Sequence, residues 1–212
     1  MDEIIDHCWL LDLDRTLSSV EVVMEAVQHV CDQMGLDYNL IEEQKKVTEA
    51  HGHSFSAPAV FRSLWPEQLD NFCDQLKVID HLDCIYPDAT IFLQQLSVRK
   101  IPHAIITYGD ALWQETKLHF GGLEQIPYIV CDIPEKYLLL NQYKHDGLFE
   151  IHTQSRVIRT KSVTLVDDKL EAFLHMPEGA RSIYMNRSEK NTEVPRGIRE
   201  VKSFTELLGE IS

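Results

Sequence analysis

The chain has 212 residues, of which 44% are hydrophobic and 25% are charged, and its formal net charge is −14. These values suit one medium-sized globular protein, or a core with a smaller insertion, and exclude disordered and collagen-like classes. The acidic balance, without a strongly basic stretch, argues against a nucleic-acid-binding or membrane-binding protein.

Three further features place the protein in a cell compartment. The five cysteines show no CxxC spacing, which indicates free thiols in a reducing environment rather than disulfides or a zinc site. The first residues lack the pattern of a signal peptide. No apolar run reaches the roughly 18 residues that a membrane span needs. We therefore expect a cytoplasmic protein, a monomer or a homodimer.

The elements predicted along the chain alternate between strands and helices, with one interruption. Apolar runs predict a first strand at 8–13, and then a purely helical block in which the helices cover 20–34, 40–51, 57–64 and 66–76. After the turn Tyr86-Pro87-Asp88, the predicted order is helix 89–99, strand 103–107, helix 110–119, strand 128–131, strand 163–166, helix 169–175 and strand 182–185.

This alternation predicts an α/β fold with a doubly wound, mostly parallel sheet. The helical block is longer than an ordinary strand-to-helix connection, so we expect it to be an inserted cap. The expected domains are a core of residues 1–17 and 84–212 and a helical cap of residues 18–83. In the alternative arrangement, these helices simply pack on the sheet.

Polar and acidic residues follow three of the predicted strands. Asp12 and Asp14 lie at the end of the first, Thr107 ends the second, and Asp167 and Asp168 follow the strand 163–166. The carboxyl ends of neighbouring parallel strands meet in one crevice, so these groups should converge. Clustered carboxylates repel one another unless a cation lies among them, and oxygen ligands suit Mg²⁺. A carboxylate beside such an ion is a usable nucleophile towards phosphorus.

In this order, Asp12-x-Asp14-x-Thr16, the strand-ending Thr107 and Val166-Asp167-Asp168 resemble motifs of the haloacid dehalogenase (HAD) superfamily. The resemblance extends from residue 8 to about residue 205. It implies a Rossmann-like core with a helical C1-type cap and Mg²⁺ as the cofactor.

The resemblance also implies a role for each matching residue. Asp12 would be the nucleophile and a metal ligand. Asp14 would be the general acid and base, and its main-chain carbonyl would bind the metal. Thr107 would bind phosphoryl oxygens together with nearby backbone N–H groups. Asp168 would be the metal-binding acid of the last motif and Asp167 its close second.

Three further residues are expected beside the substrate. They are Leu13 and Arg15, which flank Asp14, and Tyr108, which follows Thr107. Arg15 is open to two interpretations, because its side chain could reach a substrate anion or point to solvent. Asp110 is equally open, as a site residue or as the N-cap of the next helix.

A basic residue should offset the carboxylate charge, and the candidates are Lys136, Lys144 and Lys161. Lys161 precedes the strand whose far end carries Asp167. At about 3.3 Å per residue it lies roughly 20 Å away, at the opposite edge of the sheet. Lys136 would open the helix after the strand 128–131, at the crevice, and is our prediction. Lys144, near the end of that helix, is the alternative. The segment 146–160 departs from the family pattern and could form a hairpin.

These residues predict a Mg²⁺-dependent phosphatase that acts on a small phosphorylated molecule through an aspartyl-phosphate on Asp12. Dehalogenases of the superfamily lack the second acid, so they fit less well. Two alternatives stay open. One is a phosphomutase, in which the aspartyl-phosphate has a different fate. The other is a catalytically weak relative that binds a phosphorylated ligand or a protein partner.

Overall fold

The computed structural model of the protein describes residues 4–79, 81–188 and 192–211. The chain divides into two compact units. The first contains the described parts of Met1–Ser18, Ile85–Thr107 and Ile126–Ser212, and the second contains Ser19–Cys84 and Tyr108–Gln125. The helical block after the first strand therefore shares its unit with the segment 108–125. That residues 18–83 act as a cap stays a prediction.

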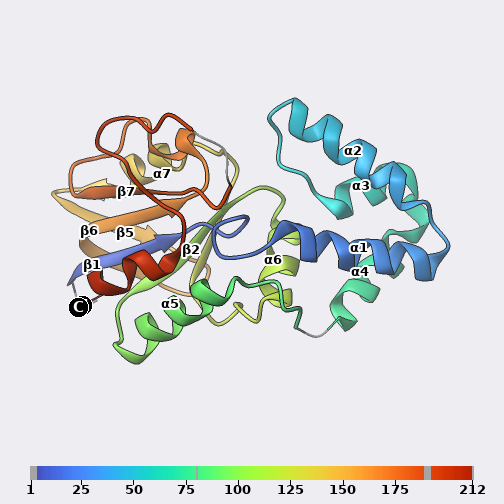
Figure 1. Ribbon diagram of the computed structural model, residues 1–212, viewed down its shortest axis with the longest axis horizontal. Coiled ribbons are helices and arrows are strands. Elements are labelled where there is room, and N and C mark those ends of the chain that lie inside the picture. The colour runs from blue at the N-terminus through green and yellow to red at the C-terminus, as the bar shows by residue number, and fades with distance from the viewer. Residues whose placement is uncertain (1–3, 80, 189–191, 212) are drawn as a thin grey trace. The chain divides into compact units, whose positions relative to one another are not determined.

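The first unit is built on a mostly parallel sheet (Figure 1). Its central strands are β1 (Ile4–Leu11) and β6 (Val157–Asp167), which are paired in parallel along most of their length. On the other side of β1 lies β2 (His103–Tyr108), followed by β3 (Tyr128–Cys131). Beyond β6 lie β7 (Ala180–Met185) and β8 (Arg199–Val201), both parallel to their neighbours. This arrangement confirms the predicted fold class.

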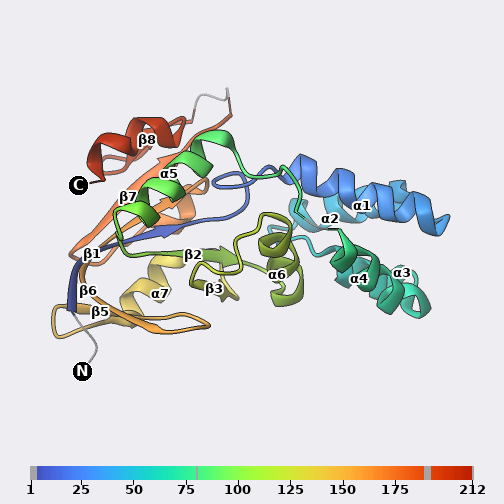
Figure 2. The same cartoon turned by 90° about the horizontal axis from the view of Figure 1, so that it is seen from below.

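Helices cover both faces of this sheet (Figure 2). On one face lie α5 (Pro87–Val98) and the 3-10 helix η3 (Phe204–Glu210), and α7 (Lys136–Tyr143) lies on the other. The ring of Phe92 on α5 packs between Trp9 of β1 and Phe204 of η3, at centroid distances of 5.2 and 4.7 Å. The apolar strand residues therefore find their partners in helices, as a doubly wound sheet requires.

A short antiparallel hairpin extends the sheet where the sequence departed from the family pattern. It consists of β4 (Lys144–His145) and β5 (Leu148–His152), joined by Asp146 and Gly147. Both turn residues have positive φ values, 51° and 79°, as two-residue hairpin turns of type I′ require. β5 pairs with the first half of β6, whereas β7 pairs with its second half.

Two predicted strands differ from the observed ones. The first strand ends at Leu11 rather than at residue 13, so Asp12 and Asp14 lie in the loop beyond it. The strand predicted at 163–166 is only the last part of β6. Its first half contains polar residues that are half-buried or exposed, and these hid the strand from a search for apolar runs.

The second unit is helical. Its elements are α1 (Val20–Met34), α2 (Tyr38–Ala50), α3 (Ala57–Leu64), η1 (Pro66–Gln68), α4 (Leu69–Val78) and α6 (Ala111–Phe120). The hydroxyl of Ser19 accepts a hydrogen bond from the N–H of Val22 and so caps α1. In the core, Phe61 of α3 stacks on Phe72 of α4 with ring centroids 3.5 Å apart.

Two predicted helices need correction. The helix predicted at 66–76 is a 3-10 turn, η1, followed by α4, which runs on to Val78. The helix predicted at 169–175 is only the 3-10 turn η2 (Leu170–Phe173). Pro177 follows closely, and a proline disfavours helical backbone in the residue before it. None of the helices that the structure describes combines the length and the apolar character of a membrane span.

Candidate active site

Three carboxylates lie close together at the carboxyl ends of two neighbouring strands of the first unit, β1 and β6. Leu11 of β1 lies opposite Val166 of β6, and the N–H of Asp12 donates a 2.9 Å hydrogen bond to the Val166 carbonyl. Asp12 therefore follows β1 at the level where β6 ends in Asp167 and continues to Asp168. One oxygen from each of these three carboxylates lies within 4.8 Å of the others. We call Asp12, Asp167 and Asp168 the carboxylate cluster.

Lys136 supplies the cation of this cluster. It is the first residue of α7, and its side chain is only 3% exposed. Its Nζ donates to Oδ1 of Asp12 and, at 2.6 Å, to Oδ2 of Asp167. The structure thus places Lys136, of the three candidate lysines, between two of the predicted site acids.

The other two candidate lysines bind elsewhere. Lys144 follows α7, donates to the main-chain carbonyl of Glu178 and lies over the ring of Phe149. Lys161 forms an ion pair of 2.7 Å with Asp6, near the beginning of β1. The position of Lys161 agrees with the strand geometry that argued against it, and Lys144 lies just after the end of α7, as predicted.

The two adjacent acids at the end of β6 have different surroundings. Both oxygens of Asp167 are engaged, since Oδ2 accepts from Lys136 and Oδ1 accepts a 2.8 Å hydrogen bond from the N–H of Lys169. Lys136 makes no hydrogen bond to Asp168 in the described structure. Lys136 therefore bridges Asp12 and Asp167, and Asp168 is the acid of the cluster to which it does not donate in the described structure.

Burial and mutual repulsion strongly perturb the ionisation of these groups. Burial raises the pKa of Asp168 to about 8, and the charges of Asp12 and Asp167 add to this. Burial also raises the pKa of Asp12 to about 6, although Lys136 opposes the shift. For Lys136, burial lowers the pKa, but Asp12 and Asp167 outweigh it and hold the pKa above its ordinary value. An added positive charge would thus favour the ionised acids.

The donor set fits a magnesium ion. Three carboxylates face one lysine, so an excess of negative charge remains in a largely buried place. Hard oxygen donors of this kind suit a small divalent cation that keeps some of its water. Asp12 and Asp168 are the side chains best placed to hold it. The role of the Asp14 carbonyl as a further ligand stays a prediction from the resemblance.

The loop after β1 folds tightly on itself. The carbonyl of Leu13 accepts hydrogen bonds of 2.9 Å from the N–H groups of both Leu17 and Ser18. The side chain of Leu13 is fully buried, so only its backbone is available to a ligand. Asp14 is half-buried and pairs with Ser18 in an isolated bridge. Arg15 has a φ of 58° and an exposed side chain.

Thr107 and Tyr108 occupy the end of β2, the strand beside β1. Thr107 is buried, and its carbonyl accepts a hydrogen bond from Sγ of Cys131. Parallel pairing with β1 brings its position to the same edge of the sheet as Asp12. Tyr108 is half-buried, and its carbonyl accepts a 2.9 Å hydrogen bond from Gln114. Asp110 caps α6, since its Oδ1 accepts from the N–H of Trp113.

One set of contacts beside the Asp14 loop is not predicted from the sequence. Arg187, two residues after β7, donates to the carbonyl of Thr16 and forms an ion pair with Asp88. In the sequence, Asp88 stands out only as part of the turn Tyr86-Pro87-Asp88. No local pattern links these residues, since Arg187 and Asp88 are 99 positions apart.

Known proteins resemble this chain in structure. No protein-family model matches the sequence, and neither does any curated protein. A HAD-like hydrolase from Burkholderia xenovorans LB400 matches with a TM-score of 0.63 and 19% identity, over 98% of both chains. The HAD-hydrolase YfnB from Bacillus subtilis, bound to magnesium, matches with a TM-score of 0.58 and 15% identity, over 99% of this chain and 100% of that one.

A dehalogenase and a phosphatase are also among the matches. The dehalogenase has a TM-score of 0.55 and 18% identity, over 99% of this chain and 98% of that one. The HAD phosphatase from Thermococcus onnurineus has a TM-score of 0.52 and 16% identity, with the same coverage. These identities establish the fold and not the activity. The chain has the fold of the HAD-like hydrolases.

Proposed function

We propose that this protein, with its HAD-like fold, is a Mg²⁺-dependent phosphatase acting on a small phosphorylated molecule. The observation that carries the proposal is the carboxylate cluster with Lys136 inside it, at the carboxyl ends of β1 and β6. Such a charge arrangement suits a cation and a phosphoryl group better than a neutral substrate. An organic halide contains no phosphoryl group. The second acid, Asp14, can donate a proton to the leaving oxygen of a phosphate ester.

In the first step, an Oδ of Asp12 attacks phosphorus and the bond from phosphorus to the ester oxygen breaks. Asp14 gives its proton to the leaving oxygen as the alcohol departs. In the second step, Asp14 takes a proton from water, the water oxygen attacks phosphorus, and the bond to Asp12 breaks. Inorganic phosphate leaves, and both acids return to their starting states.

The other site residues orient the nucleophile and bind the phosphoryl group. Lys136 favours the ionised form of Asp12 and orients its carboxylate, because the Nζ donates to Asp12 and Asp167 at once. Thr107 and the backbone of Leu13 and Tyr108 would bind phosphoryl oxygens, and the exposed side chain of Arg15 would meet a substrate anion. Asp12 and Asp168 would hold Mg²⁺, which would supply positive charge for the phosphoryl oxygens. A cytoplasmic location and a monomeric or dimeric state belong to the same proposal.

The test is hydrolysis of 4-nitrophenyl phosphate with Mg²⁺ and with EDTA. We expect wild-type activity that EDTA abolishes, and a loss of more than about 10³-fold in Asp12→Asn. Lys136→Ala should lose most turnover. Lys161→Ala is the matched control, because it removes an exposed lysine that pairs with a carboxylate near the middle of β6, six positions before Asp167. Unchanged activity in Asp12→Asn would overturn the assignment of the nucleophile.

The same assay separates the alternatives. A phosphomutase would transfer phosphate from a bisphosphorylated donor to a second hydroxyl more quickly than to water. A catalytically weak relative would bind phosphate esters, seen by calorimetry, without turnover on a broad panel of esters. Either result would replace the phosphatase assignment while leaving the metal site in place.

A further inference from the structure

The loop that carries Asp14 is held from outside as well as by its own hydrogen bonds. The N–H of Tyr86 donates a 3.0 Å hydrogen bond to the carbonyl of Leu17. Nε of Arg187 donates a 3.1 Å hydrogen bond to the carbonyl of Thr16. Thr16 is two residues from Asp14, so these contacts fix the backbone on the carboxyl-terminal side of the proposed acid. All of these residues belong to the first unit.

Arg187 is itself held on several sides. Its two terminal nitrogens bind the two oxygens of Asp88 at 3.1 and 3.0 Å. Both side chains are only 16% exposed. The guanidinium carbon lies 4.0 Å from the centroid of the Tyr86 ring and 5.6 Å from that of Phe204. A planar cation with a two-pronged partner and aromatic rings around it has little freedom to turn.

Asp88 completes the arrangement. It lies in the first turn of α5, and its Oδ2 also accepts a 2.7 Å hydrogen bond from the N–H of Phe204 in η3. The Asp14 loop, the start of α5, the segment after β7 and the start of η3 are therefore tied to one ion pair. We call Arg187 and Asp88 the loop clamp.

We propose that the loop clamp positions Asp14 for proton transfer. Arg187 acts through the carbonyl of Thr16, and Asp88 acts through Arg187. Neither touches the carboxylate cluster in the contacts described above, so both are positioning residues rather than catalytic ones. The role given to Asp14 rests on the proposed phosphatase function. The mechanical part, that the clamp fixes the loop, stands without it.

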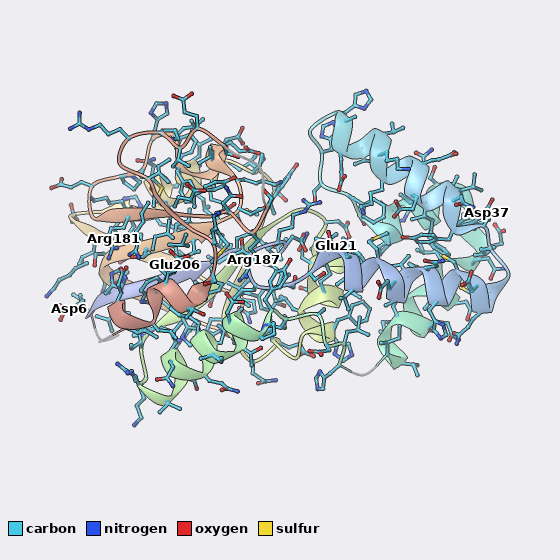
Figure 3. All side chains as sticks on the ribbon, viewed as in Figure 1. Asp6, Glu21, Asp37, Arg181, Arg187 and Glu206 are labelled. Carbon is cyan, nitrogen blue, oxygen red and sulfur yellow. The ribbon has the colours of Figure 1, made fainter. Side chains whose placement is uncertain are left out.

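A second arginine provides the matched control. Arg181 lies on β7, only six positions before Arg187, and it also pairs with a carboxylate, Glu210, at 2.8 Å. It is 56% exposed and well separated from Arg187 (Figure 3). Exposed pairs of this kind contribute little to stability. Arg181→Met therefore removes an arginine from the same region without touching the Asp14 loop.

The first measurement needs no activity. Amide hydrogen exchange of Leu17 and Ser18, which donate to the Leu13 carbonyl, reports the opening of the loop. We expect exchange about 10-fold faster in Arg187→Met than in wild type, no change in Arg181→Met, and a value between the two in Arg187→Lys. Wild-type exchange in a folded Arg187→Met would overturn the proposal. If Arg187→Met does not fold, wild-type exchange in Arg187→Lys would overturn it.

The second measurement asks whether proton donation is affected. A poor leaving group needs the acid, whereas 4-nitrophenolate leaves almost unaided. We expect Arg187→Met to lower kcat about 10-fold or more on an alkyl phosphate but only a few-fold on 4-nitrophenyl phosphate. Asp14→Asn should show the same bias. Equal losses on both esters would mean a general structural role and would overturn the link to Asp14. If wild type hydrolyses neither ester, the proposed function fails, and the exchange data still decide whether the clamp holds the loop.

Discussion

Replacing Lys136 with methionine would remove the cation of the site while keeping a side chain of similar length. Asp12 and Asp167 would then face each other, largely buried, without the Nζ that binds both. Removing one partner of a buried ion pair typically costs about 3–5 kcal/mol. The full cost applies only where both acids are ionised. Because the pKa of Asp12 is already raised to about 6, Asp12 would take up a proton as the pH falls, and this would reduce the loss of stability.

The loss of stability should therefore depend on pH. In EDTA at pH 8, we expect Lys136→Met to lower the free energy of unfolding by about 3 kcal/mol. At pH 5, where Asp12 is largely protonated, the loss should be roughly 1 kcal/mol. Urea unfolding followed by circular dichroism at the two pH values measures both. Lys144→Met is the control, because its Nζ meets a main-chain carbonyl, and it should cost less than about 1 kcal/mol at either pH. Equal losses at both pH values would refute the electrostatic explanation.

Four further predictions concern the carboxylate cluster, the β4–β5 turn and the second unit. The raised pKa values of Asp168 and Asp12 mean that, in EDTA, the folded state binds more protons than the unfolded chain. The free energy of unfolding should therefore fall by on the order of 2 kcal/mol from pH 5 to pH 8. Saturating Mg²⁺ should remove most of this fall, and a free energy of unfolding that rises with pH in EDTA would contradict the prediction. Asp168→Asn should weaken Mg²⁺ binding, measured by calorimetry, by at least about 10-fold, and equal affinity would exclude Asp168 as a ligand. Gly147→Ala should cost about 1 kcal/mol in thermal unfolding, because Gly147 has a φ of 79° in the β4–β5 turn, and no cost would mean that the turn relaxes. Phe61→Ala should cost about 3–5 kcal/mol by removing the ring stacked on Phe72, and a much smaller loss would show that the second unit repacks.

Much of the fold could be predicted because its signals are local. The helices at 20–34 and 57–64 were placed correctly to the residue, since caps and apolar spacing lie within a few positions of each other. The convergence of Asp12 with Asp167 and Asp168 followed from one rule about parallel strands. Lys136 was distinguished from Lys144 by a turn at Pro134 that starts a helix at the same edge.

The features that sequence analysis missed depend on partners far away in the chain. The first half of β6 is a strand because β1 and β5 flank it, and its own polar residues do not indicate this. The Arg187–Asp88 pair joins segments 99 positions apart, and neither residue stands in a recognisable pattern. Tertiary contacts, and not propensity, decide such positions.

The pairing of β1 with β6 also has a consequence for folding. Its contacts join residues about 155 positions apart, as in the hydrogen bond between His7 and Ser162. Closing so long a loop is entropically costly and slows folding. The three acids therefore exist as a group only after the first and last parts of the chain have met. A chain emerging from the ribosome carries Asp12 long before Asp167 and Asp168, so the metal site can form only once β6 has been synthesised.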